Sequence, residues 1–150
     1  AVAEGVLAGY RVVDLKAEFY DGKQHPVDSK DIAFQMAGKQ AFREAFLAAQ
    51  PCLLEPVLNI EIKVPEHYMG DVMGDISSRR GKIIGMDTDG TFQQIKAQVP
   101  QSELYHYSTR LRSLTGGRGI HSEEFSHYEE VPREMETKVT ASAKAAQEGD

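Results

Sequence analysis

The residues with the clearest chemical potential are two groups of basic side chains. A guanidinium group presents a planar fork of donors that matches phosphate oxygens, so clustered arginines favour contacts with an anionic backbone. A cation near the C-terminal end of a helix also interacts favourably with the helix dipole, and this is the alternative explanation for the basic residues. We interpret both groups as candidate phosphate-binding residues. They are Arg79, Arg80 and Lys82 in the first group and Arg110, Arg112 and Arg118 in the second.

The loop at residues 20–29 is a second candidate site. It reads YDGKQHPVDS, and its Asp21-Gly22 pair is a strong turn signal. Loops that are held by rigid elements carry binding residues disproportionately often. Taken alone, His25 is explained as an ordinary histidine in a connection between a strand and a helix.

The sequence contains no motif for nucleotide binding or for a metal-dependent enzyme. It has no GxxxxGK[ST], no GxGxxG after a strand and no HExxH. The glycine-rich run at residues 116–119 follows a predicted helix, so we interpret it as a helix stop and a tight turn. The five histidines lack metal-ligand spacing, and Cys52 is the only cysteine. We therefore expect no catalytic residue, no metal site and no cofactor in this chain.

The composition describes an acidic chain without membrane or export signals. Its 150 residues include 17 basic and 23 acidic side chains, and the formal net charge is −6. Net charge therefore does not hold it to nucleic acid, and any such contact must come from local patches. No apolar run approaches the roughly 20 residues of a membrane-spanning helix, and no signal peptide opens the sequence. Because the first residue is Ala rather than Met, we expect a fragment of a longer polypeptide. The single cysteine excludes a disulfide framework, so we expect a reducing, cytosolic setting.

A first unit, which we place at residues 1–55, must position the loop. Residues 10–20 alternate apolar and polar side chains with a period of two, which predicts a half-buried strand. Asp28 or Ser29 can then cap a helix that carries a broad apolar face as far as Ala49. Pro51 ends this helix.

A second unit, which we place at residues 56–132, has a βαββαβ pattern. Strands are predicted at residues 58–64, 82–86, 91–99 and 120–128, and helices at residues 69–76 and 104–114. Gly81 is the predicted stop of the first helix. This order predicts a ferredoxin-like split βαβ sandwich, an α+β fold with both helices on one face of the sheet.

The two basic groups follow the two predicted helices of the second unit. We expect strands one and three to be central and parallel, with each helix running back along the strand before it. Both helices would then point the same way, and all six basic side chains would lie at one end of the domain. The polar tail at residues 133–150 is expected to be a loose helix or disordered.

Six sequence strings resemble bacterial elongation factor G, and they occur in the family's order and at its spacing. The resemblance covers the chain up to about residue 135. The strings are LAGY.VVD (7–14), YDG..H.VDS (20–29), LLEP (53–56), YMGDVMGDISSRRGKIIGM (68–86), LRSLTGGRG (111–119) and EFSHYEEVP (124–132).

The resemblance implies a fold and a function. Residues 1–55 would be the C-terminal half of the family's fourth domain, a partial S5-domain-2-like α/β unit, and residues 56–132 its ferredoxin-like fifth domain. The parent protein would be a cytoplasmic GTPase that promotes GTP-dependent translocation of tRNA and mRNA in polypeptide elongation. It would bind GTP and Mg²⁺ in an N-terminal domain, with no cofactor in this fragment.

The resemblance also implies partners on the ribosome. The fourth domain reaches the decoding region of the small subunit, and the fifth domain contacts the GTPase-associated region of the large subunit. His25 matches the histidine at the tip of the fourth domain, so Gly22, His25, Asp28 and Ser29 become RNA-binding candidates. The six basic residues become candidates for binding rRNA.

Two departures from the family pattern leave alternatives open. The tip reads His25-Pro26-Val27-Asp28-Ser29-Lys30, where the family usually has His-Asp/Glu-Val-Asp-Ser-Ser. Polar residues occupy 121–124, where the family's last strand is usually more apolar. A divergent paralogue of elongation factor G, a ribosomal-protection protein and a stand-alone ferredoxin-like binding module therefore remain alternatives.

Overall fold

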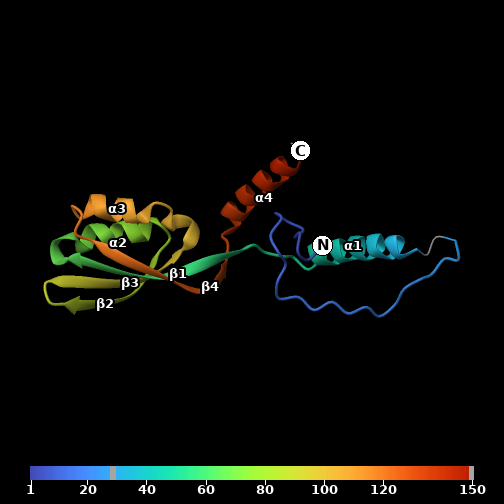
Figure 1. The fold of residues 1–150 in the computed structure, drawn as a ribbon, viewed down its shortest axis with the longest axis horizontal. Helices are drawn as coiled ribbons and strands as arrows, with labels where there is room; N and C mark the ends of the chain where they lie inside the picture. The colour runs from blue at the N-terminus through green and yellow to red at the C-terminus, as the bar shows by residue number, and fades with distance from the viewer. Residues whose placement is uncertain (28–29, 149–150) are drawn as a thin grey trace. The chain divides into compact units, whose positions relative to one another are not determined.

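The chain folds as two units, which we describe separately. The structure is a computed structural model that describes residues 1–27 and 30–148. Unit 1 comprises Ala1–Leu53 and Val131–Asp150, and unit 2 comprises Leu54–Glu130 (Figure 1). The chain passes from unit 1 into unit 2 after Leu53 and returns to unit 1 after Glu130.

Unit 2 is a four-stranded antiparallel sheet with two helices on one face (Figure 1). The strand order is β2-β3-β1-β4. This arrangement confirms the α+β fold and the βαββαβ order that the sequence predicts. The elements are β1 (Leu54–Pro65), α2 (Met69–Ser78), β2 (Lys82–Asp89), β3 (Phe92–Pro100), α3 (Tyr107–Leu114) and β4 (Ile120–Glu130), with short 3-10 turns at Glu66–Tyr68 and Gln101–Leu104.

The core of unit 2 lies between the sheet and its two helices. Alternate residues of the central strands point toward the helices, which is why the period-2 pattern identified these strands. Val72 and Ile76 of α2 meet them one helical turn apart. The buried residues of this core are Ile60, Ile62, Val64, Val72, Ile76, Ile95, Ala97, Val99, Leu104, Tyr107 and Leu111.

The prediction that strands one and three are parallel is wrong. β1 and β3 are antiparallel neighbours. The crossover through α2 makes β1 and β2 parallel, and the tight hairpin then reverses β3, so α3 runs opposite to α2. The C-terminal ends of the two helices therefore lie at opposite ends of unit 2, and the six basic residues do not form one cluster.

The end of α2 differs from the predicted glycine stop. Arg80, with φ 59°, takes the left-handed position that glycine usually fills. The Gly81 N–H donates to the Ile76 carbonyl at 2.9 Å, which closes the final turn. Gly81 is required for a different reason, because a Cβ there would lie 2.5 Å from Ile76 Cγ2 and 2.7 Å from the Ile76 carbonyl oxygen. The left-handed conformation costs Arg80 roughly 1–2 kcal/mol relative to glycine.

Gly81→Ala is expected to destabilise unit 2, because the added methyl group overpacks the contact between α2 and β3. The cost should be about 1–3 kcal/mol, which lowers the melting temperature by about 4 °C or more. Gly74→Ala is the matched control, because it lies in α2 with nothing within 4 Å of its added Cβ and should be neutral or stabilising. Thermal unfolding followed by circular dichroism would distinguish them. Equal melting temperatures for the two variants would contradict the close packing at Gly81.

Unit 1 contains two described helices, α1 (Asp31–Ala48) and α4 (Arg133–Glu148). The tail therefore takes the helical alternative. The predicted strand at residues 10–20 is wrong, because this segment forms no strand and exposes Phe19 and Tyr20. The Val12 N–H donates to the Val2 carbonyl at 2.9 Å, but this single bond does not continue into a ladder. A period-2 pattern becomes a strand only when a partner supplies ladder hydrogen bonds, and the described part of unit 1 offers none. Asp28 and Ser29 lie outside the described residues, and Lys30 occupies the N-cap of α1 without a side-chain hydrogen bond.

Candidate nucleic-acid interface

Arg79 and Arg110 share one carboxylate inside unit 2. Arg79 Nε donates to Asp75 Oδ2 at 2.8 Å, and Arg110 Nε donates to Asp75 Oδ1 at 3.1 Å. The Asp75 side chain is only 8% exposed. Arg79 also donates to the Glu103 carbonyl and places its guanidinium carbon 5.1 Å from the centre of the Tyr107 ring. These two arginines therefore hold α2 against α3 and the segment before it.

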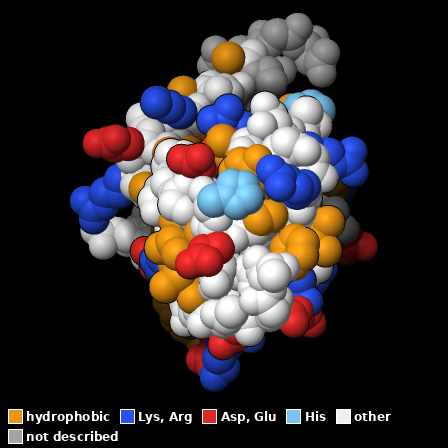
Figure 2. All heavy atoms as spheres, turned by 90° about the vertical axis from the view of Figure 1, so that its left-hand side faces the viewer, with side chains coloured by type: hydrophobic (Ala, Val, Ile, Leu, Met, Phe, Trp, Pro, Cys, Tyr) orange, Lys and Arg blue, Asp and Glu red, His pale blue; other side chains and the backbone are white. Residues whose placement is uncertain are grey.

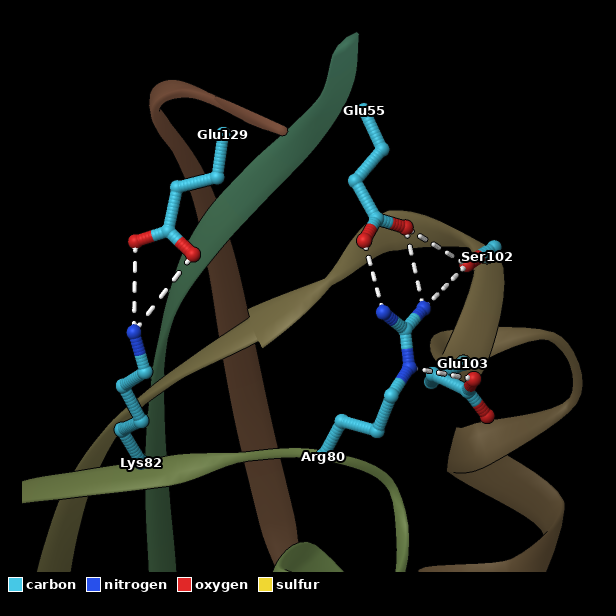
Figure 3. Close-up of polar contacts among 6 residues, drawn as sticks. All are labelled: Glu55, Arg80, Lys82, Ser102, Glu103 and Glu129. Carbon is cyan, nitrogen blue, oxygen red and sulfur yellow. Dashed lines mark hydrogen bonds and ion pairs between the residues drawn. The ribbon is translucent and has the colours of Figure 1, made fainter. Parts of the chain in front are cut away.

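Arg80 is held by carboxylates on two other elements (Figure 3). Its Nη1 and Nη2 donate to Glu55 Oε1 and Oε2 at 2.6 and 2.9 Å, a bidentate pair, and its Nε donates to Glu103 Oε1 at 3.0 Å. The hydrogen bonds to Glu55 raise the pKa of Arg80 above its ordinary value. Because every nitrogen of this guanidinium already has a carboxylate partner, Arg80 is a poor phosphate ligand.

Lys82 also has an intramolecular partner. Its ammonium nitrogen lies 3.4 Å from Glu129 Oε1 (Figure 3). A hydrogen bond from His127 and the nearby Lys82 both lower the pKa of Glu129. Both side chains are well exposed, so this pair is weaker than the Arg80–Glu55 pair.

Arg118 lies at the opposite end of unit 2, beside the start of α2. Its Nη2 donates to the Tyr68 hydroxyl at 2.6 Å, and its guanidinium carbon lies 5.0 Å from the centre of the Tyr68 ring. The same Nη2 lies 3.5 Å from His67 Nε2. No carboxylate takes part in these contacts, so the positive charge of Arg118 is not neutralised by them.

A buried hydroxyl shapes the loop that carries Arg118. Thr115 Oγ1 donates to the Leu111 carbonyl at 2.8 Å and accepts from the Gly119 N–H at 2.7 Å. Gly116 and Gly117 take left-handed conformations, and the Gly117 N–H donates to the Arg112 carbonyl at 2.8 Å. The predicted helix stop and turn are therefore confirmed, and this turn places Arg118 at the protein surface.

Arg112 completes this basic end of unit 2, in the last turn of α3. It is exposed, and within the described part of the chain it forms no ion pair. Figure 2 looks onto this end and shows basic side chains among hydrophobic, histidine and acidic ones. Of the six predicted basic residues, Arg112 and Arg118 are thus the two without a carboxylate partner among the described residues.

Two aromatic residues at this end, His67 and Tyr68, were not among the predicted site residues. Their rings lie 4.0 Å apart, and both contact Arg118. Aromatic rings beside guanidinium groups are typical of sites that stack bases and bind phosphates. A prediction with β1 and β3 antiparallel would have indicated these two residues, because that topology places the start of α2 beside the end of α3.

The loop of unit 1 is exposed. Gly22 and His25 are both exposed, and the Gly22 N–H donates to Asp21 Oδ1 at 2.7 Å. Pro26 and Val27 form a turn. Asp28 and Ser29, the other two predicted tip residues, lie outside the described residues. The loop belongs to unit 1 and the basic end to unit 2, so they are two separate candidate sites.

The described part of the chain contains neither a candidate metal site nor a candidate membrane-spanning helix. Residues 1–27 and 30–148 contain no group of three or more His, Cys, Asp or Glu side chains that could hold a metal ion. None of the helices in these ranges has the length and apolar character needed to cross a membrane.

Comparison with known proteins decides the family. A family model for elongation factor G domain IV matches residues 1–50, and a model for the elongation factor G C-terminus matches residues 52–139. The chain belongs to the elongation factor G family. Elongation factor G of Aquifex pyrophilus is 51% identical over 139 residues, which cover 93% of this chain and 20% of that protein.

A solved structure has the same fold as this chain. A crystal structure of a protein from Thermus thermophilus matches 96% of this chain and 22% of its own, with 40% identity and a TM-score of 0.81. This chain thus spans about a fifth of the length of these relatives. The two matched models follow each other in the order that the resemblance in the sequence implies, so that resemblance is confirmed.

Proposed function

We propose that this chain is the ribosome-binding C-terminal region of a translational GTPase that promotes GTP-dependent movement of tRNA and mRNA. The main support for this proposal is the 51% identity to elongation factor G of Aquifex pyrophilus along 93% of the chain. Identity at this level, across both matched domains, favours a shared role over a shared fold alone.

In this proposal the two candidate sites contact different parts of the ribosome. Residues 1–55 belong to domain IV, and the loop with Gly22, His25, Asp28 and Ser29 reaches the decoding region of the small subunit. Residues 56–132 form domain V, followed by the polar segment 133–150. Arg112 and Arg118 bind rRNA of the GTPase-associated region, because their charges are not neutralised by carboxylates of unit 2.

The nucleotide chemistry belongs to another part of the proposed protein. This chain has no phosphate-binding GxxxxGK[ST] motif, and its described residues provide no metal-ligand cluster. The residues present therefore do not fit GTP or Mg²⁺, which would be bound by the N-terminal GTPase domain. We place the complete factor in the cytoplasm, where translation takes place.

The proposal is tested by removing this region from the complete factor. A factor that ends before residue 1 should bind GTP with unchanged affinity but should no longer drive tRNA–mRNA movement. The 150-residue chain alone should give a flat calorimetric titration with GTP and GDP. Full-rate movement by the truncated factor, or micromolar binding of GTP by the chain alone, would overturn the proposed function.

A further inference from the structure

Two carboxylates face each other where the chain enters and leaves unit 2. Glu55 of β1 and Glu129 of β4 are directly opposite in the register of the two strands. Beyond them lie only the Leu54 and Glu130 pair and a hydrogen bond from the Val131 N–H to the Leu53 carbonyl at 2.9 Å, where the chain passes into unit 1. Like charges in directly opposite positions destabilise strand pairing. These strand ends would therefore separate easily unless both charges were compensated.

Each carboxylate is compensated by a cation that follows α2: Arg80 lies between α2 and β2, and Lys82 is the first residue of β2 (Figure 3). Glu129 also lies 3.0 Å from His127 Nε2. Arg80 forms its bidentate pair with Glu55, whose side chain is 13% exposed, and Lys82 reaches Glu129. Ser102 Oγ adds a hydrogen bond to Glu55 Oε2 at 3.4 Å. The two cations flank Gly81, whose lack of a side chain lets this segment pack directly on Ile76 and Val99.

The backbone at Arg80 indicates that its side chain is needed. The equivalent position after α3 is Gly116, with φ 57°, and Arg80 adopts φ 59°. Glycine adopts this conformation without strain, whereas arginine does not. Backbone preference alone therefore favours glycine at position 80, and only the contacts of the guanidinium group favour arginine.

We propose that Arg80 and Lys82, together with Glu55 and Glu129, form a clamp that keeps the ends of β1 and β4 paired. Arg80 is its principal positioning residue, because its carboxylate partner is the more buried one. The clamp acts within unit 2 at both points through which unit 2 is joined to the rest of the chain. It rests on the proposed function in one respect: movement at the tip loop requires a firm attachment to the ribosome-bound unit 2.

Hydrogen exchange on the 150-residue chain tests the clamp without reference to the ribosome. In Arg80→Gly, the amides of residues 54, 55, 57 and 127–130 should exchange about tenfold faster, because charge-assisted hydrogen bonds that hold the strand ends are lost. Amides at Ile62 and Ile95 should be unchanged. Arg112→Ala, which removes an exposed arginine without an ion pair among the described residues, is the control. Unchanged or slower exchange at the strand ends of Arg80→Gly, as relief of backbone strain predicts, would overturn the clamp.

Two further variants separate charge from geometry. Glu55→Gln keeps the shape of the acceptor but removes its charge. It should accelerate exchange at the same amides, because the loss of the bidentate charge-assisted pair with Arg80 outweighs the relief of repulsion from Glu129. Arg80→Lys keeps the charge but loses the bidentate fork, so its exchange rates should lie between those of the wild type and Arg80→Gly. Exchange that is as slow in Glu55→Gln as in the wild type would overturn the assignment of Glu55 as the partner.

The positioning role is tested in the complete factor. Arg80→Gly should slow tRNA–mRNA movement several-fold, while ribosome-stimulated GTP hydrolysis stays within about twofold of the wild type, because the clamp contacts neither nucleotide nor RNA. A parallel fall in both rates, or normal movement despite faster exchange, would overturn the positioning role. A wild-type factor that drives no movement would instead reject the proposed function, and hydrogen exchange would still decide whether the clamp exists.

Discussion

His25→Ala in the complete factor is expected to slow tRNA–mRNA movement at least several-fold and to leave ribosome-stimulated GTP hydrolysis near normal. His25 lies in an exposed loop that precedes α1, and the following Pro26 restricts His25 toward extended conformations. An imidazole there can donate and accept hydrogen bonds with an RNA backbone and can stack on a base. The resemblance to elongation factor G implies that the tip acts after hydrolysis, so the two rates should separate.

The two rates are measured by stopped-flow translocation and phosphate-release assays on the same preparation. Gln24→Ala is the matched control, because it truncates the neighbouring exposed side chain of the same loop. A parallel loss of both rates would assign His25 to ribosome binding or folding rather than to a tip function. No change in either rate would favour a divergent paralogue, with Pro26 and Lys30 as the marks of an altered tip.

The fold of unit 2 was predictable because its signals are local. Leu58, Ile60, Ile62 and Val64 alternate along β1, and Gly90 marks the β2–β3 hairpin, so elements and order followed from the sequence. The relative direction of β1 and β3 was predicted wrongly, because strand direction depends on how many times the chain reverses between the two strands. One hairpin between two crossovers places α3 antiparallel to α2, and this reversal separates Arg118 from Arg80.

The candidate site was predictable only in part, because a sequence does not show which charges are already paired. Arg80 meets Glu55 and Glu103 at separations of 25 and 23 residues, and neither contact follows from a local pattern. The Tyr68 contact with Arg118 spans 50 residues. In unit 1, residues 10–20 carry a strand pattern, but a strand also needs a partner, which no local pattern supplies.

The replacement of both Arg112 and Arg118 by alanine is expected to weaken ribosome binding of the complete factor and to change its salt dependence. Both side chains lack carboxylate partners among the described residues, so they are available for phosphate groups. Binding through fewer phosphate contacts releases fewer counterions, so ribosome affinity depends less steeply on salt concentration. Loss of a favourable helix-dipole interaction at Arg112 would lower stability without changing this slope.

Arg110→Ala is the matched control for this double variant. It removes the same type of side chain from the same helix, but Arg110 already pairs with Asp75 at 3.1 Å. Its removal should therefore change ribosome affinity less than the double variant does at any salt concentration, because its guanidinium group is already held by Asp75 within unit 2.

The slope of the logarithm of ribosome affinity against the logarithm of salt concentration tests most directly whether this basic end of unit 2 binds rRNA. We expect a slope that is shallower by about 1.5 for the Arg112 and Arg118 double variant, since two phosphate contacts are lost. The slope for Arg110→Ala should be unchanged. An unchanged slope for the double variant, or an equal change in the Arg110 control, would contradict rRNA binding by this end.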